Sequence, residues 1–105
     1  MAYFHLKLLP PRLSFPQDAT EEELAAMQRH AAYWRRHADT GMAIAVGPVF
    51  DRNGAWGMAV IEVADADAAQ AAADADPVIQ AGLGFRFEVS PMPSLILRPT
   101  AGAAV

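Results

Sequence analysis

Hydrophobic and polar positions alternate along residues 2–9. This period of two predicts a β-strand, because successive side chains of a strand point to opposite faces. One face carries Phe4, Leu6 and Leu8, and the other carries Tyr3, His5 and Lys7. Pro10 and Pro11 end the predicted strand, since proline has no N–H for a sheet ladder. A loop is expected to follow to about Ala19.

The pattern then changes to a spacing of three to four residues, which predicts a helix lying on a core. Thr20 and Glu23 match a capping box at its start, and Gly41 is expected to end it in a left-handed conformation. The apolar stripe of this helix consists of Leu24, Met27, Ala31, Trp34 and Ala38. His30 lies roughly 70° from the centre of the stripe, so we expect it at the edge of the buried face.

Two strands joined by a hairpin are predicted next. Residues 42–50 are apolar on both faces, which is typical of a strand covered on both sides, and Gly47-Pro48 suggests a bulge or bend near its end. Asn53-Gly54 is a strong hairpin signal. Residues 56–63 are the expected returning strand.

Alanine dominates residues 64–75, which predicts a second helix whose small side chains let it lie close to the sheet. Asp76 is expected to cap a short helical turn, 77–80, that Gly82 closes.

Residues 85–89 alternate again and predict a last strand, stopped by two prolines. Ser94–Leu97 can form a short extra strand, and a loose tail is expected over Arg98–Val105. The chain therefore divides into one domain, residues 1–93, and a C-terminal extension, residues 94–105.

The predicted order β-α-β-β-α-β indicates an α+β protein with the ferredoxin-like fold, in which a four-stranded antiparallel sheet carries two helices on one face. The other face is bare but apolar in part, since the third strand places Trp56, Met58 and Val60 on one side. A partner usually covers such a patch, so we predict a homodimer in which two sheets face each other. The large residues predicted for the core are Trp34, Phe50, Trp56 and Phe85.

Composition narrows the possible functions. The chain has 105 residues, of which 53% are apolar and 19% charged, a balance that argues for one folded domain and against disorder. The net charge is −4 and Lys7 is the only lysine, so nucleic-acid binding is not expected. No apolar run has the length of a membrane span and no export signal is evident, so no membrane association is expected. The absence of cysteine fits a cytoplasmic protein.

His30 is the first candidate for chemistry. An imidazole can take up and return a proton near neutral pH, so His30 can serve as a general acid or base. The alternative is a half-solvated histidine that only packs on Trp34. His37 is expected to act as a partner of the helix dipole. It lies seven residues from His30, about 10 Å along a helix, which is too far for the pair to share a metal ion. No metal site and no cofactor are predicted.

Asp76 is the second candidate. An aspartate before a proline at a helix start is a good cap, and that alone can explain it. A capping carboxylate can also accept an N–H from an imidazole and fix its tautomer, provided that one oxygen remains free.

Around these two residues we expect a small-molecule pocket whose wall includes His5, Trp34, Gly47 and Pro48. His5 has an alternative role, in which it forms a polar pair with Tyr3 at a dimer interface. Lys7, on the same face, can offset an anionic or phenolate substrate. For Trp34 the alternative is an ordinary core position.

The ordered set of these features resembles the YCII (YciI-like) family. The matching features are His30 eleven residues before Gly41, a short strand ending in Gly47-Pro48, and an alanine-rich helix running to Ala75-Asp76-Pro77. The resemblance covers roughly residues 2–92. It implies a ferredoxin-like fold, a dimer of the α+β barrel kind, and an active site centred on a histidine and an aspartate, which by position are His30 and Asp76. Dehydrochlorination of a chlorinated aromatic is one activity linked to the family, and most members have no assigned reaction.

Three functional hypotheses follow. The leading one is a cofactor-independent lyase or isomerase in which His30 moves a proton on a small, ring-shaped or enolisable molecule and Asp76 orients the imidazole. The second is a non-catalytic module of the same fold that binds a small molecule or a partner. The third is a cofactor-free quinol monooxygenase.

Overall fold

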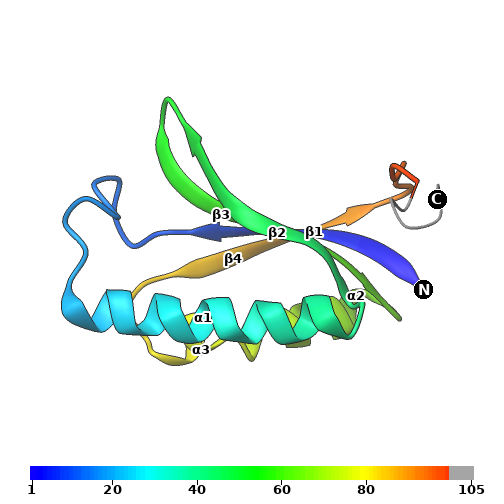
Figure 1. The fold of residues 1–105 in the computed structure, drawn as a ribbon, viewed down its shortest axis with the longest axis horizontal. Coiled ribbons are helices and arrows are strands. Elements are labelled where there is room, and N and C mark those ends of the chain that lie inside the picture. Colours follow the sequence, from blue (N-terminus) through cyan, green and yellow to red (C-terminus); the bar gives the residue numbers. More distant parts are fainter. Residues whose placement is uncertain (100–105) are drawn as a thin grey trace.

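The computed structural model describes residues 1–99 of the chain. Its elements in chain order are β1 (Ala2–Leu9), α1 (Glu21–Asp39), β2 (Ala43–Asp51), β3 (Gly54–Val63), α2 (Ala66–Asp74), α3 (Pro77–Gln80) and β4 (Arg86–Met92). The predicted β-α-β-β-α-β order is confirmed, with α3 as the predicted helical turn after the second long helix (Figure 1).

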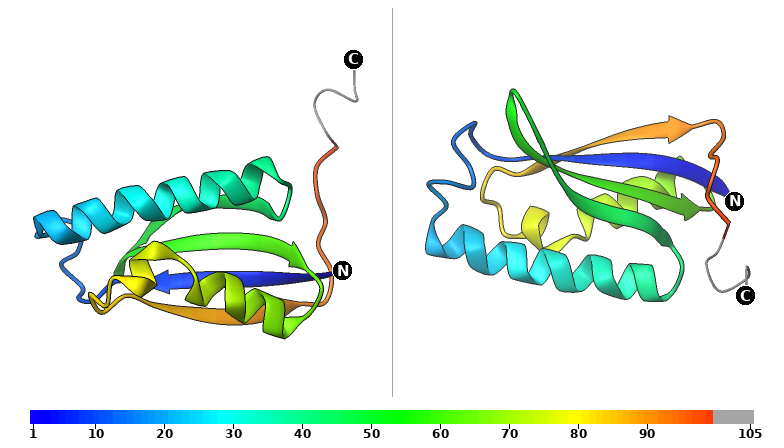
Figure 2. Two further views of the ribbon diagram at one scale, coloured as in Figure 1. Left: turned by 90° about the horizontal axis from the view of Figure 1, so that it is seen from below. Right: turned by 45° about the horizontal axis from the view of Figure 1, so that its top comes forward.

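The four strands form one antiparallel sheet in the order β2-β3-β1-β4. Leu6 at the middle of β1 pairs with Ala59 of β3 on one side and with Val89 of β4 on the other. All three helices lie on one face of this sheet (Figures 1 and 2). This is the predicted ferredoxin-like arrangement.

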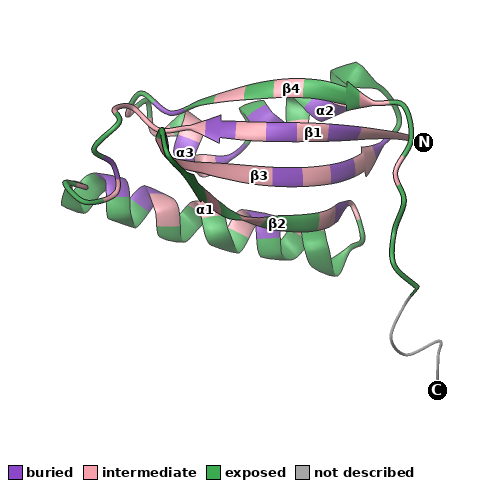
Figure 3. Cartoon of the chain, turned by 90° about the horizontal axis from the view of Figure 1, so that it is seen from above, coloured by how far each residue is buried: buried purple, intermediate pink, exposed green. Residues whose placement is uncertain are grey.

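The core lies between the two central strands and the helices. Figure 3 shows buried residues concentrated along β1 and β3, while the edge strands β2 and β4 are mostly exposed or half-buried. The alternation predicted for β1 is confirmed, because Phe4, Leu6 and Leu8 are buried whereas their neighbours are only half-buried. Trp34 and Phe85 are buried, as predicted. The small side chains of α2 pack toward the sheet as predicted, and Ala69 and Ala73 are buried.

The signals at the two ends of α1 are confirmed. The Thr20 hydroxyl accepts from the backbone N–H of Glu23, and the Glu23 carboxylate accepts from the backbone N–H of Thr20. This reciprocal pairing satisfies two N–H groups that the helix itself leaves free. After the helix, Gly41 has φ = 88°, a left-handed conformation that costs glycine little. The helix therefore begins and ends where the sequence predicts.

Strand β2 corrects part of the sequence analysis. It was predicted to be covered on both sides, but it is an edge strand in which only Ala43 is buried. The hairpin of β2 and β3 curls away from the helices (Figure 1), so Phe50 near its tip is 69% exposed and Trp56 is half-buried. Neither residue belongs to the core, because no helix reaches this part of the sheet.

The predicted bulge at Gly47-Pro48 is also wrong. The pairing with β3 continues through both residues, and the irregularity lies between Ala43 and Ala45. An edge strand pairs on one side only, so it tolerates a proline that a central strand would not.

No extra strand forms at residues 94–97, contrary to prediction. Strand β4 does not stop at Pro91 as predicted but pairs with β1 through Met92, because an edge strand tolerates proline. The chain then leaves the sheet (Figure 2), so residues 94–97 have no neighbouring strand with which to pair. Of the predicted tail, residues 100–105 lie outside the described part. Among residues 1–99, no helix is both long and apolar enough to cross a membrane.

Candidate functional site

A histidine and a buried carboxylate meet between α1 and α3. The Nδ1 atom of His30, in the middle of α1, lies 2.6 Å from Oδ2 of Asp76, the residue that caps α3. The His30 side chain is 14% exposed and the Asp76 side chain is fully buried. The two candidates that the sequence places 46 positions apart are therefore in direct contact.

Asp76 carries out both of the roles that its sequence position suggests. Its Oδ1 atom accepts the backbone N–H of Val78 at 2.9 Å, which is the helix cap. Its Oδ2 atom accepts the indole N–H of Trp34 at 2.7 Å and contacts His30. One oxygen caps the helix and the other remains available to the imidazole.

This arrangement selects a tautomer of His30. The indole and backbone N–H groups that reach Asp76 are obligatory donors, so the environment favours a carboxylate that accepts at both oxygens. A carboxylate at 2.6 Å in turn favours a proton on Nδ1 of His30. In the neutral ring the lone pair then lies on Nε2, which has no protein partner within residues 1–99. The geometry therefore presents a basic nitrogen on the side of the ring away from Asp76.

The His30 ring lines a cavity of about 620 Å³ between α1 and the hairpin of β2 and β3. This volume falls in the range typical of small-molecule sites. The lining is apolar almost throughout, with Leu8, Phe15, Met27, Trp34, Phe85 and Phe87 among its residues. Such a cavity can hold a compact hydrophobic molecule beside the imidazole.

The other predicted pocket residues separate into two groups. Trp34, Gly47 and Pro48 all line the cavity that contains His30. His5 does not line it. Its strand position places it on the bare face of the sheet, where it pairs with Val60 and its ring packs edge-on against Trp56 at a centroid distance of 6.1 Å. His5 and His30 are therefore on opposite faces of the sheet.

Tyr33 and His37 lie on α1 on either side of Trp34, within a few residues of the contact with Asp76. Tyr33 donates its hydroxyl to the backbone carbonyl of Ala72 at 2.7 Å, which ties α1 to α2. Burial, and then the nearby negative charge of Asp76, raise the pKa of Tyr33. The ring of His37 packs edge-on against Tyr33 at 4.5 Å. Burial, followed by the positive charge of Arg36, lowers the pKa of His37. His37 does not line the cavity.

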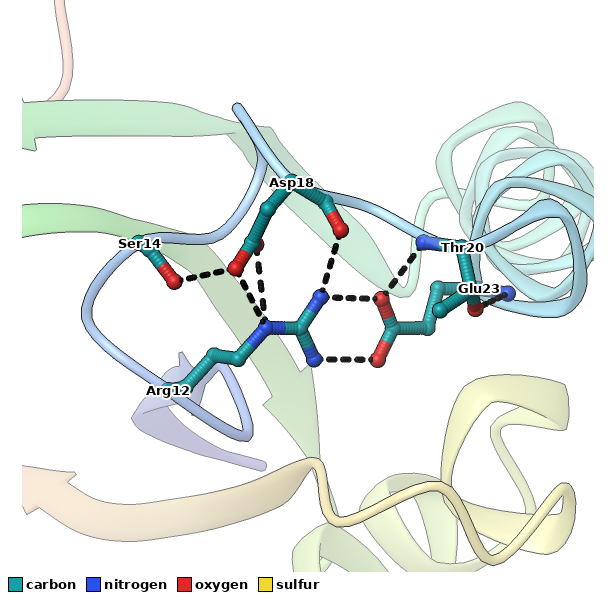
Figure 4. Close-up of polar contacts among 5 residues, drawn as sticks. All are labelled: Arg12, Ser14, Asp18, Thr20 and Glu23. Carbon is teal, nitrogen blue, oxygen red and sulfur yellow. Dashed lines mark hydrogen bonds and ion pairs between the residues drawn. The ribbon is translucent and has the colours of Figure 1, made fainter.

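An ion-pair network holds the loop at one end of the cavity (Figure 4). Arg12 donates through two nitrogens to the Glu23 carboxylate, both at 2.7 Å, and through Nε to Asp18 at 2.9 Å. The hydrogen bonds from Arg12 lower the pKa of Glu23 to about 2 and lower that of Asp18. Within this loop, Phe15 and Pro16 face the cavity. The network therefore fixes one wall of the site to the first turn of α1.

Sequence reasoning missed this network and the contact between Trp34 and Asp76. The signal for the network was an arginine and an aspartate in a proline-rich loop directly before the capping box. The contact with Trp34 had no sequence signal, because it depends on the crossing of α1 and α3. Within residues 1–99, no three His, Cys, Asp or Glu side chains gather in a way that could hold a metal ion.

Comparison with known proteins identifies a family. The family model described as "YCII-related domain" matches residues 12–93, which is most of the chain. No protein of curated function matches it.

Proposed function

The chain belongs to the YCII-related family, and from its His30–Asp76 site we propose that it is a cofactor-independent lyase or isomerase acting on a small, ring-shaped or enolisable organic molecule. The observation that carries the proposal is the hydrogen-bonding contact of 2.6 Å between His30 and the buried Asp76. The His30 ring that makes this contact also lines an apolar cavity.

In the proposed reaction, Nε2 of His30 takes a proton from an activated C–H of the substrate. The imidazolium that forms keeps both nitrogens protonated, and Asp76 stabilises its charge through Nδ1–H. In an isomerase the same proton returns to another atom of the substrate. In a lyase the electron pair left on carbon forms a double bond as a leaving group, such as chloride, departs. Histidine proton transfer contributes roughly 10²–10⁴-fold, so the proposal fits activated substrates.

The remaining predicted residues have proposed roles as well. Trp34, Gly47 and Pro48 form walls that exclude water from the substrate. His5 lies with Trp56 and Met58 on the bare sheet face, which we propose is covered by the same face of a second copy. These apolar side chains are half-buried in the single chain, which leaves surface for a partner. We propose a cytoplasmic location on the basis of the cysteine-free composition.

A substrate panel tests the reaction class. The panel contains enolisable cyclic ketones, unsaturated lactones and chlorinated hydroquinones. NMR detects solvent deuterium entering carbon positions, and an ion-selective electrode detects chloride release. We expect turnover of at least one class without added metal or cofactor, and loss of that turnover in His30→Ala with the fold retained. His37→Ala, two turns further along α1 and outside the cavity, is the matched control.

The result that overturns the proposal is full activity in His30→Ala. Oxygen uptake with a quinol, at the same rate in both variants, would instead support the monooxygenase. A ligand that binds equally well to wild type and His30→Ala, with no product from any class, would support the binding module.

A further inference from the structure

We propose that Arg35 binds an anionic group of the ligand at the mouth of the cavity, so that the substrate class is a compact apolar molecule with one carboxylate or phenolate. This inference rests on the proposed function for the identity of the reacting molecule. The anion site itself depends only on the residues that line the cavity and on their place on α1.

The cavity lining contains very few polar side chains. Apart from glycine, alanine and larger apolar residues, it comprises His30, Arg35 and the indoles of two tryptophans. Both indole N–H groups are already engaged, that of Trp34 by Asp76 and that of Trp56 by Asp51. The polar side-chain groups left for a ligand are therefore the Nε2 atom of His30 and the guanidinium of Arg35.

Among residues 1–99, no acidic residue lines this cavity. Two arginines have acidic partners, since Arg12 pairs with Glu23 and Arg86 with Glu88. Arg35 forms no ion pair in the described part of the chain, although Asp39 lies one helical turn further on. The donors of Arg35 are therefore free for a ligand anion, beside an apolar wall that can hold the rest of the ligand.

The helix places the two groups on opposite sides of the cavity. At 100° per residue, Arg35 lies about 140° around α1 from His30 and about 7.5 Å further along its axis. Met27, Ala31 and Ala38 occupy the angles between them and line the cavity. A ring that rests on this apolar strip can place an anionic substituent near Arg35 and a ring or α-carbon near Nε2 of His30.

The guanidinium geometry suits such a group. Its planar set of donors binds a carboxylate through two parallel hydrogen bonds, and it also binds a phenolate oxygen. Arg35 is exposed at its outer side, so its substitution leaves the core intact. Arg29 is also an exposed arginine of α1, but it does not line the cavity, which makes it a matched control.

Direct binding of benzoate and benzamide tests the inference without any turnover. The two probes have nearly the same shape and differ in charge. Trp34, one of the two tryptophans of the chain, lines the cavity beside His30, so a change in its fluorescence reports occupancy of the cavity. We expect wild type to bind benzoate at least ~10-fold more tightly than benzamide, the size of effect expected for a charge-assisted hydrogen bond.

The variants identify the residue responsible. We expect Arg35→Gln to lose that ~10-fold preference while keeping its affinity for benzamide, and Arg29→Gln to keep the preference. We expect His30→Gln to retain most of the preference as well. Equal binding of both probes by wild type, or an equal loss in Arg29→Gln, overturns the inference. Loss of the preference in His30→Gln alone also overturns it, because the anion would then bind the histidine.

Failure of this inference differs from failure of the proposed function. If His30→Ala keeps full turnover while benzoate binding still requires Arg35, the proton-transfer reaction is wrong and the anion site stands. If turnover requires His30 and benzoate shows no preference, the reaction stands and the anion site is wrong.

Discussion

The Oδ2 atom of Asp76 lies 2.6 Å from Nδ1 of His30, and the same aspartate caps α3 through Oδ1. The capping role anchors the carboxylate to a backbone N–H, so the group that orients the imidazole cannot rotate freely. Stability and orientation of the site therefore depend on the same side chain.

Replacement of Asp76 by Asn tests this dependence. A carboxamide has one acceptor oxygen, whereas N–H groups of Val78 and Trp34 approach different oxygens of Asp76. Whichever way the amide is turned, a buried N–H faces the NH₂ group. We expect the free energy of unfolding to fall by about 1–3 kcal/mol, measured by urea denaturation. Asp74→Asn, at an exposed position, should change it by less than about 0.5 kcal/mol. A change for Asp76→Asn as small as that for Asp74→Asn would contradict the geometry.

The tautomer of His30 is a second prediction. Because the Asp76 carboxylate faces Nδ1, we expect the neutral ring to carry its proton there and to leave Nε2 unprotonated. Nitrogen-15 NMR of the histidine side chains distinguishes the two tautomers. His5 has no side-chain hydrogen bond within residues 1–99 and serves as the internal comparison, since nothing there favours Nδ1–H. A proton found mainly on Nε2 of neutral His30 would rule out Nε2 as the proposed base.

The elements with strong local signals could be predicted from the sequence. The capping box at Thr20, the left-handed Gly41 and the period-two pattern of β1 each reflect contacts within a few residues, and each was correct. The burial of strand β2 could not be predicted, because an apolar sequence is compatible both with a central strand and with an edge strand beside a cavity. Phe50 is apolar and exposed for that reason, since it lines the cavity instead of filling the core.

The candidate site was predictable only in part. His30 and Asp76 could be named, from a helix edge, a cap and a family resemblance, but their contact depends on how α1 crosses α3. The position of His5 shows what strand alternation cannot predict. Its strand alternation correctly places it opposite Phe4 and Leu6, but the pattern does not show that the cavity opens on the helix side of the sheet.

The closeness of α2 to the sheet is a third prediction. Ala69 and Ala73 are almost fully buried under the sheet, so a larger side chain has no room there. We expect Ala69→Leu to lower the free energy of unfolding by about 1–3 kcal/mol through overpacking. Ala71→Leu, on the exposed side of the same helix, should have an effect within about 0.5 kcal/mol. Thermal unfolding of the two variants provides the comparison, and equal midpoints would mean that α2 does not pack as closely as described.

The fourth prediction concerns the dependence of stability on pH, through Glu23. Its pKa is lowered from 4.5 to about 2, chiefly by hydrogen bonds from Arg12. The folded state therefore binds this proton less readily than the unfolded chain. Its contribution to stability is fully present above pH 4.5 and is lost as the pH falls toward 2. Glu23→Gln keeps a side chain that can complete the capping box but has no charge for Arg12.

We therefore expect Glu23→Gln to be less stable than wild type at pH 7, and the two unfolding midpoints to converge as the pH falls below 4.5. Glu22→Gln, at an exposed position without an ion pair in the described residues, should follow the wild-type curve. A constant difference between wild type and Glu23→Gln down to pH 2.5 would contradict the ion pair.

Because Arg12 also binds Asp18, loss of Glu23 should loosen the loop that carries Phe15 into the cavity. The variant should then bind benzamide more weakly at pH 7, although no residue in contact with the ligand has changed.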